Sequence, residues 1–457
     1  MSIPTNIFFS FPEMMEQDQF LNLTDLQFLT KKYLDNSSRK EVTEDELLRI
    51  TRTLANSDRS DDEKDYEVMT ECLRCLRNAV AGQESNQSLV ASQLFTSSSS
   101  SLHELMSRLT LHPSTEKSIV ALRVSLQLVY NLITDNRDSQ LLFLENTSLL
   151  STLKTILSNI SDDKCKKFGS LILQNFLEDH EYFENLSPEF SFRMSEFIPV
   201  MAALYQDEED CSKKCLEYLL SSHVYLQHLT REERVACVDI IPFPPDEEII
   251  QLLMSDFTYL TDVHLLTHNN SSSVSSVLEA SHVLALTHFL STCSGHVSLQ
   301  SVMQSNKSLV INTTYLLKMV HQSAATDQDL TVLNKLSDVL DLDKDDSKTK
   351  ITDSPTFGFK ECLIELLTNL VWDHHENQTL VGELSGVALL MDCSQIDARN
   401  PFITQRVILA IKALTTNHQE NQKVLAGMKK LGAADSSLLS ELGLYRDSDG
   451  NIKKVER

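Results

Sequence analysis

The chain has 457 residues, of which 41% are apolar, and only 10 glycines and 10 prolines. That length exceeds what one ordinary hydrophobic core supports, and scarce glycine and proline favour helices, so several helical domains or a helical repeat array are expected. The formal net charge of −25 repels phosphate backbones and anionic lipid, so nucleic acid and membrane surfaces are disfavoured as main partners. It suits a basic protein surface, or simply a highly soluble chain.

The cysteines and the lack of long apolar runs indicate a compartment. Nine cysteines, an odd number without framework spacing, are expected to be free thiols in a reducing environment. Ile7–Phe9 is too short for a secretion signal, and no apolar run approaches the ~18 residues of a membrane span. The sequence therefore predicts a cytoplasmic protein without membrane insertion.

Four segments along the chain share one sequence frame. They are 73–87, 126–140, 363–378 and 407–422. In the first three, Asn78, Asn131 and Asn369 stand eight residues before a pair that ends in glutamine, and Ala413 takes that place in the fourth. A weaker fifth copy surrounds Asn175. Such self-similarity predicts one structural unit repeated along the chain.

Each copy has apolar residues at three positions around the shared asparagine or alanine: three before it, two before it and one after it. These positions form a single stripe on a helix. The stripes are Cys75, Leu76 and Ala79; Leu128, Val129 and Leu132; Leu366, Leu367 and Leu370; and Ala410, Ile411 and Leu414. Asn131 and Asn175 are 44 residues apart, as are Asn369 and Ala413, which matches the roughly 40–47 residues of armadillo and HEAT units. A fainter sixth copy is placed at His288. The fold class predicted is all-α, an armadillo/HEAT-like α-solenoid of superhelical helical repeats.

Composition divides the chain into four expected parts. They are 1–341, N-terminal armadillo-like helical repeats; 342–357, an acidic linker or loop; 358–445, a C-terminal domain of two armadillo-like repeats; and 446–457, a flexible tail. The linker has little to bury and contains the break Ser354-Pro355. The polyserine run Ser97–Ser101 is expected to be a loop insertion. The prolines of Ile241–Asp246 should end one helix, and Asp246 could cap the next.

Sequence marks of enzymes are missing, because no P-loop, GxGxxG, nucleophile elbow or HExxH pattern occurs. No catalysis, cofactor or metal is expected. Cys72 and Cys75 form a CxxC pair, but Cys75 falls on the apolar stripe, so core packing is favoured over a metal site. Cys211 and Cys215 are interpreted in the same way. The histidines of 374–376 point to different helix faces and are expected at a solvated helix end.

The repeated asparagines are the candidate partner-binding residues. An asparagine amide offers two donors and an acceptor, which is enough to hold the backbone of an extended peptide in a groove. The candidates are Asn78, Asn131, Asn175 and Asn369, with the neighbouring Trp372. The alternative, which stays open, is that each asparagine caps or bridges within its own repeat.

One stretch carries a family resemblance. Residues 377–393 and 396–403, with the Asn400-Pro401-Phe402 turn, are followed by 411–415 and 420–422, and in this order they resemble the C-terminal domain of the ataxin-10 family. The chain departs from that family at Gln405-Arg406 and Ala413. The resemblance implies a cytoplasmic α-solenoid without catalysis, associated with cytokinesis, cell survival and neurite growth. It also implies protein partners that include the G-protein β subunit, and perinuclear or centrosome and midbody sites within the cytoplasm.

Two other classes of function remain open. A nuclear-transport-type adaptor would bind basic peptides in an acidic groove, but such adaptors pair a tryptophan with each groove asparagine, and this chain has 1 Trp. An enzyme would need a convergent pocket of perturbed residues, which sequence alone does not show. The leading prediction is a non-catalytic scaffold or adaptor that binds other proteins, with its oligomeric state open.

Overall fold

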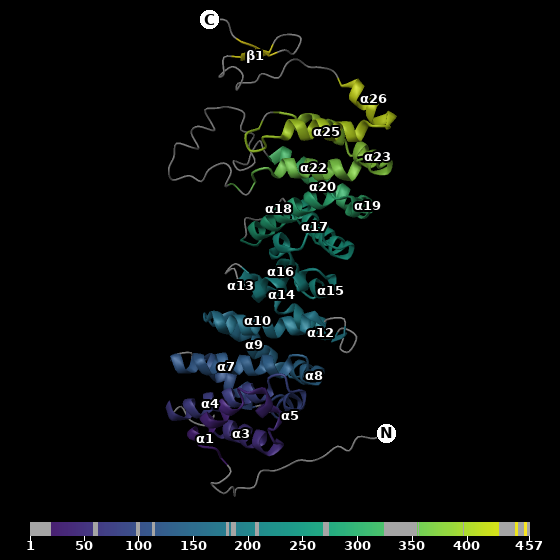
Figure 1. The fold of residues 1–457 in the computed structure, drawn as a ribbon. Helices are drawn as coiled ribbons and strands as arrows, with labels where there is room; N and C mark the ends of the chain where they lie inside the picture. Colours follow the sequence, from purple (N-terminus) through teal and green to yellow (C-terminus); the bar gives the residue numbers. More distant parts are fainter. Residues whose placement is uncertain are drawn as a thin grey trace. The chain divides into compact units, whose positions relative to one another are not determined.

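The structure is a computed structural model that describes most of the chain. The described residues are 20–57, 63–96, 101–111, 115–179, 182–183, 189–205, 210–267, 274–323, 354, 356–395, 397–428, 444–446 and 452–454. The chain divides into two compact units, unit 1 (Met1–Leu219) and unit 2 (Leu220–Arg457). Each unit is a stack of helices and has its own buried core (Figure 1).

Unit 1 is helical throughout its described residues. Its helices are α1 Leu23–Lys32, α2 Asn36–Lys40, α3 Glu44–Ser57, α4 Glu63–Val80, α5 Glu84–Phe95, α6 Ser101–Leu111, α7 Glu116–Ile133, α8 Arg137–Glu145, α9 Thr147–Asn159, α10 Asp163–Glu178, α12 Glu189–Ser195, α13 Ile198–Tyr205 and α14 Asp210–Leu220.

The described residues of unit 2 form helices and one small hairpin. Its helices are α15 His223–Leu226, α16 Arg231–Ala236, the 3-10 helix η2 Val238–Ile240, α17 Glu247–Thr267, α18 Val274–Ser294, α19 Val297–Ser305, α20 Lys307–Ser323, α22 Phe359–Val371, α23 His375–Glu383, α24 Gly386–Asp392, α25 Ile403–Thr415 and α26 Gln419–Gly427. The strands β1 Leu444–Arg446 and β2 Ile452–Lys454 pair antiparallel.

Several helices begin where the sequence supplies a side-chain cap. Thr115 and Ser118 form a reciprocal capping box at the start of α7, which satisfies backbone donors that the first turn leaves unpaired. Asp162 caps α10 by accepting from the Cys165 N–H. Helix α17 begins at Glu247, directly after Asp246, as the proline-rich stretch predicts.

A repeat consists of a long helix followed by two shorter ones, as in α7, α8 and α9 or in α22, α23 and α24. The turn after the long helix has a left-handed residue four positions beyond the repeat asparagine, or beyond Ala413 in the fourth copy. These residues are Gly82, Asp135, Asp373 and Asn417, with φ values of +66°, 55°, 53° and 57°. Glycine, asparagine and aspartate tolerate this conformation best. The residue after each one is the N-cap of the next helix, and its side chain accepts a backbone hydrogen bond at Asn136, His374 and His418 but not at Gln83.

The prediction of an all-α helical repeat fold is confirmed. The predicted apolar stripes lie in the core: Leu128, Val129 and Leu132 are fully buried. The exception is Ile411, which is half-buried because α25 is the last long helix among the described residues.

Parts of the predicted domain division lie outside the described residues. Of the linker 342–357, only 354, 356 and 357 are described, and of the polyserine run only Ser101, where α6 begins. In the sequence, the boundary between the two compact units falls between Leu219 and Leu220. Within the predicted flexible tail, the described residues belong to the β1–β2 hairpin.

Candidate partner-binding face

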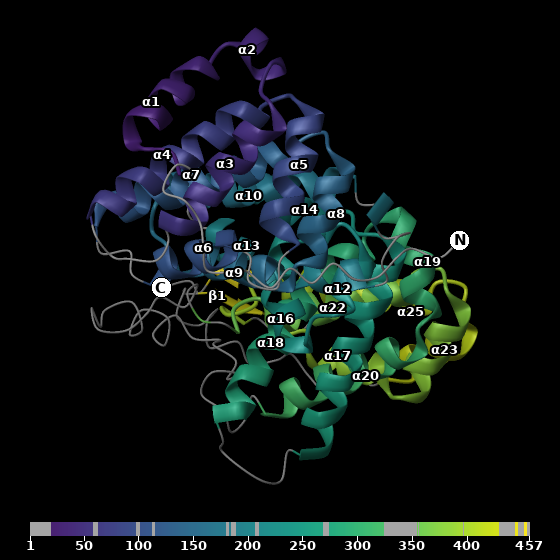
Figure 2. The ribbon, with the colours of Figure 1, turned by 90° about the horizontal axis from the view of Figure 1, so that it is seen from below.

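In each unit the long helices lie side by side and form a row. The unit 1 row is α4, α7 and α10, and the unit 2 row is α18, α22 and α25 (Figure 2). The predicted asparagines all lie on these rows. Successive helices of a repeat protein build an extended surface of this kind, which is where such folds bind their partners.

Three glutamine side chains, Gln87, Gln304 and Gln378, each join one repeat to the next. The shared arrangement is a glutamine amide that donates to two backbone carbonyls at the end of the following long helix, where helical carbonyls have no internal partner. The bonds are Gln87 Nε2 to Asn131 O (2.6 Å) and Thr134 O (3.1 Å), Gln304 Nε2 to Asn369 O (3.0 Å) and Trp372 O (2.8 Å), and Gln378 Nε2 to Ala413 O (2.8 Å) and Thr416 O (3.3 Å).

The asparagine that precedes the glutamine in the sequence bonds toward the preceding repeat rather than the following one. Its amide donates to a carbonyl of the helix before it in the same repeat and to a carbonyl of the preceding repeat. The bonds are Asn86 Nδ2 to Ala79 O (2.9 Å) and Arg39 O (3.1 Å), Asn377 Nδ2 to Leu370 O (2.8 Å) and Gln304 O (2.9 Å), and Asn421 Nδ2 to Leu414 O (3.0 Å) and Gln378 O (2.9 Å). Together with the glutamines they form what we call the amide ladder, one ladder segment within each unit.

In unit 1 the structure links two of the predicted asparagines through Arg77. Asn131 Nδ2 donates to Arg77 O (3.0 Å), and the Arg77 guanidinium donates to Asn78 Oδ1 (2.9 Å) and to Gln127 Oε1 (2.6 Å). Asn78 is buried, and its Nδ2 donates to Thr30 O on α1 (3.1 Å). Burial, with the neighbouring Arg74 charge, lowers the pKa of Arg77.

In unit 2, Gln304 joins the other predicted pair, because it donates to the carbonyls of both Asn369 and Trp372. The Asn369 amide donates to Ser294 Oγ (2.9 Å) on α18, and the Trp372 side chain is 44% exposed. Asn175 is half-buried on α10, and no hydrogen bond of its side chain occurs among the described residues.

These positions can be compared with the alternative that each asparagine caps or bridges within its own repeat. The amides of Asn78, Asn131 and Asn369 bridge neighbouring helices, and the bridges run between repeats rather than within one. Each amide still has a second hydrogen, so their role in partner binding stays a prediction.

The glutamines of the amide ladder were not among the predicted site residues. The signal was present in the sequence, since Gln87 and Gln378 recur nine residues after the repeat asparagine. A repeated polar pair on a helical repeat thus indicates the joint between repeats, where a side-chain amide replaces missing backbone partners.

A polar line, partly exposed at two of its three residues, crosses the unit 2 row. Ser291 Oγ on α18 donates to Glu365 Oε2 on α22 (3.3 Å), and Arg406 on α25 donates to Glu365 Oε1 (2.6 Å). The Glu365 and Arg406 side chains keep 31% and 37% of their area exposed. We call Ser291, Glu365 and Arg406 the polar line. It could meet a partner with charged or hydrogen-bonding groups.

A thiol and an imidazole lie beside the polar line. Cys362 Sγ is 3.1 Å from His288 Nδ1. Burial, with the Glu365 and Glu361 charges, raises the pKa of Cys362 to about 11, so the thiol stays protonated near neutral pH. A nucleophilic cysteine needs the opposite shift, which makes this pair a poor catalytic dyad.

A groove of about 420 Å³ lies at the start of the unit 1 row, between α1, α4 and α7. Three glutamates line it, of which Glu71 bonds Arg74 (3.0 Å) and Glu67 bonds Lys117 (3.1 Å). Glu116 is the third. The groove therefore has mixed charge with a small acidic excess.

From the sequence, Cys72, Cys75, Cys211 and Cys215 are predicted to pack in the core. Cys72 and Cys75 are buried free thiols, and Cys75 Sγ donates to Leu26 O (3.0 Å). Burial raises the pKa of Cys75 to about 12. Cys215 is a buried free thiol, and the Cys211 side chain lies outside the described residues.

The histidines of 374–376 lie at the start of α23, where the His374 Nδ1 caps the helix and the His375 ring stacks on His418 at 4.7 Å. In the described part of the chain, no cluster of three histidine, cysteine or acidic residues could hold a metal, and no helix is long and apolar enough to cross a membrane.

The chain is similar to known proteins of one group. A family model described as the spinocerebellar ataxia type 10 protein domain matches residues 359–455. Ataxin-10 of Xenopus tropicalis is 27% identical over 414 residues, which are 86% of this chain and 81% of that protein. Ataxin-10 of Homo sapiens is 27% identical over 84% of this chain and 81% of its own length. The chain is similar to ataxin-10 over most of its length, and residues 359–455 match the domain of that family.

More distant members of the ataxin-10 family match a shorter stretch. The ataxin-10 homolog of Dictyostelium discoideum is 34% identical over 95 residues, which are 21% of this chain. A solved structure from work on the interaction between cadherin and beta-catenin aligns with 87% of this chain at 13% identity and a TM-score of 0.29, which is too low to carry an argument.

Proposed function

We propose that this ataxin-10-like chain is a non-catalytic scaffold or adaptor that binds other proteins through its long-helix rows. The observation that carries the proposal is the polar line of unit 2, where the partly exposed ion pair of Glu365 on α22 and Arg406 on α25 is held by a hydrogen bond from the buried Ser291 of α18. Partly exposed ion pairs of this kind can be exchanged for pairs with a partner at small net cost.

The finer roles rest on the family alone. For this chain we propose participation in cytokinesis, cell survival and neurite growth, with the G-protein β subunit among the partners. The place of action proposed is the cytoplasm, with perinuclear, centrosome or midbody association. The predicted residues Asn78, Asn131, Asn175, Asn369 and Trp372 would contribute to the partner surface.

Charge reversal on the polar line tests the proposal. Glu365→Lys places a cation beside Arg406 and should remove most partner capture in quantitative pull-downs from cells. Glu383→Lys makes the same change at an exposed position at the end of α23 and should leave capture unchanged. If both variants fold, and Glu365→Lys captures the same proteins at the same level, the unit 2 row is not the binding face.

The second candidate is a nuclear-transport-type adaptor. The feature that favours it is the acidic excess of the groove lined by Glu67, Glu71 and Glu116. A fluorescence titration with a lysine-rich peptide would show saturable binding that weakens with salt, and Glu116→Lys would reduce it. Absence of salt-sensitive binding would remove this candidate.

A further inference from the structure

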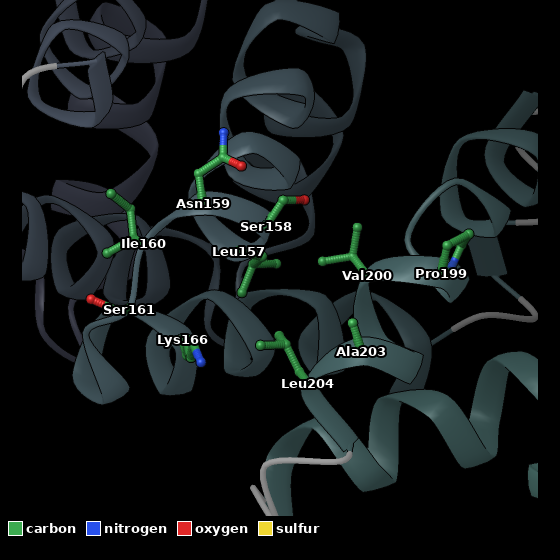
Figure 3. A pocket seen from close by; sticks show the side chains of 10 residues that line it. All are labelled: Leu157, Ser158, Asn159, Ile160, Ser161, Lys166, Pro199, Val200, Ala203 and Leu204. Atoms are coloured by element: carbon green, nitrogen blue, oxygen red, sulfur yellow. The ribbon is translucent and has the colours of Figure 1, made fainter.

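Unit 1 contains a second concave feature away from the asparagines. A pocket of about 460 Å³ lies between the end of α9, the start of α10 and α13. Figure 3 shows Val200 and Leu204 of α13 pointing toward Leu157 of α9, with Lys166 of α10 beside them. The volume falls within the roughly 300–1,000 Å³ typical of ligand pockets.

The floor of the pocket is apolar and already well packed from behind. Leu157, Ile160, Val200 and Leu204 are each at most 9% exposed. Behind the floor α10 approaches closely, since a Cβ at Gly169 would lie 2.7 Å from Leu157 Cδ2. The floor is therefore held firmly from the core side, and the space in front of it fits an aliphatic side chain.

Charge at the pocket is opposite to that of the chain. Lys166 is the charged residue among the described lining residues. Two further lysines, Lys164 and Lys167, lie in the first turns of α10 with Asp163. Asp162 is engaged by Arg123, whose Nε donates to its Oδ1 at 2.8 Å. A locally basic site on a chain of net charge −25 favours acidic groups that the rest of the surface repels.

Polar rim residues complete the site. Ser158, Asn159 and Ser161 are exposed at the edge where α9 ends. They offer hydroxyl and amide groups to a bound backbone, next to the apolar floor and the lysine. Apolar depth with a few polar groups at the rim is the usual composition of a peptide-binding pocket.

We propose that this pocket binds a short partner-protein segment that carries a large aliphatic residue next to acidic residues. The aliphatic side chain lies on the floor formed by Leu157, Val200 and Leu204, and the acidic side chain lies toward Lys166. An anionic membrane is disfavoured as the occupant because it would face the negatively charged surface around the pocket, whereas a short segment approaches the pocket alone. The inference rests on the proposed protein-binding function but concerns a different surface of the chain.

The test uses a fluorescein-labelled peptide in which a Leu-Leu pair is flanked by glutamates, titrated against the full chain by fluorescence anisotropy. Saturable binding is expected. Peptides with lysines for the glutamates, or serines for the leucines, should bind at least about tenfold more weakly, since each lacks one of the two matched features.

Two variants assign the binding to the pocket. Ala203→Trp fills the space from an exposed position and should weaken the peptide about tenfold, and Lys166→Glu should weaken it about three- to tenfold. Lys412→Glu, the same charge change at an exposed position of α25, should have no effect.

Two results would overturn the inference: no saturable binding of the glutamate–leucine peptide, or binding that neither pocket variant changes. Either result leaves the proposed function standing, because capture through the unit 2 row is measured with Glu365→Lys. Conversely, unchanged capture by Glu365→Lys leaves the pocket test unaffected.

Discussion

At the residue scale, a buried acid stands out near the start of unit 2. Asp256 is 2% exposed, and its carboxylate accepts from Arg234 Nε (2.7 Å) and Arg231 Nε (3.2 Å). Arg234 is itself buried. Removing one partner of such a pair leaves an uncompensated buried charge, whereas forming the pair adds little net stability.

Asp256→Ala should therefore destabilise the helices around α16 and α17 by about 3–5 kcal/mol. The measurement is hydrogen-exchange protection of α17, which reports local stability in a chain with two units. Asp239→Ala, at an exposed position nearby, should change protection by less than about 0.5 kcal/mol. Equal effects of the two variants would show that the ion pair is not buried as described.

A second residue-scale prediction concerns acid. Hydrogen bonding to Arg123 lowers the pKa of Asp162 to about 2, from an ordinary value of 3.8. Because the folded-state pKa is the lower one, the stabilisation is fully present above the ordinary value and is lost as pH falls from about 4 toward 2.

Asp162→Asn separates charge from capping, since asparagine still caps α10. It should lower the unfolding midpoint at neutral pH and make unit 1 less sensitive to acid across that window. Thermal unfolding followed at pH 7 and at successively lower pH is the measurement. An unchanged acid sensitivity would contradict the role given to the Arg123–Asp162 pair.

At the element scale, the amide ladder sets how one repeat holds the next. Gln378→Leu removes the donor to Ala413 O and Thr416 O, and should cost about 1–2 kcal/mol of protection in α25. Gln422 occupies the same place one repeat later, but it is exposed and donates to Thr415 O. Gln422→Leu is therefore the matched control, and a similar loss in both would argue against the ladder.

Gly382 lies at the contact between α23 and α26 and provides a second test of how repeats are joined. A Cβ at Gly382 would lie 2.2 Å from Asn421 Oδ1, while one at Gly427 would meet nothing within 4 Å. Gly382→Ala should displace the Asn421 side chain and destabilise the α23–α26 joint by about 1–3 kcal/mol. Gly427→Ala should be neutral or slightly stabilising, as in a helix generally. Thermal unfolding compares the two.

At the scale of the whole molecule, much of the repeat architecture could be predicted from local pattern. The stripe around Asn131, and its return 44 residues later at Asn175, places the long helices correctly because periodicity is a property of the sequence itself. The contacts between repeats could not be predicted in this way. Arg77 reaching Gln127, and Arg234 reaching Asp256, join residues whose proximity depends on how the helices pack.

In the candidate site, too, local pattern could be predicted from the sequence and contacts between repeats could not. The sequence indicated which positions recur, but it did not indicate that the asparagine amides would bridge helices, because a side chain's partner is set by the neighbouring repeat. The pocket between α9 and α13 has no repeated signal, since Leu157, Lys166 and Leu204 come from three separate helices. Single-copy features of this kind appear only in three dimensions.

A charge swap between α22 and α25 tests whether the unit 2 row is a protein-binding face. The double variant Glu365→Lys with Arg406→Glu keeps an ion pair between α22 and α25 but inverts its direction, so the fold should persist, as unchanged circular dichroism and unfolding would show. Quantitative pull-down is expected to lose the partners that the wild-type chain captures. Full retention of those partners by the folded double variant would show that the unit 2 row is not the binding face.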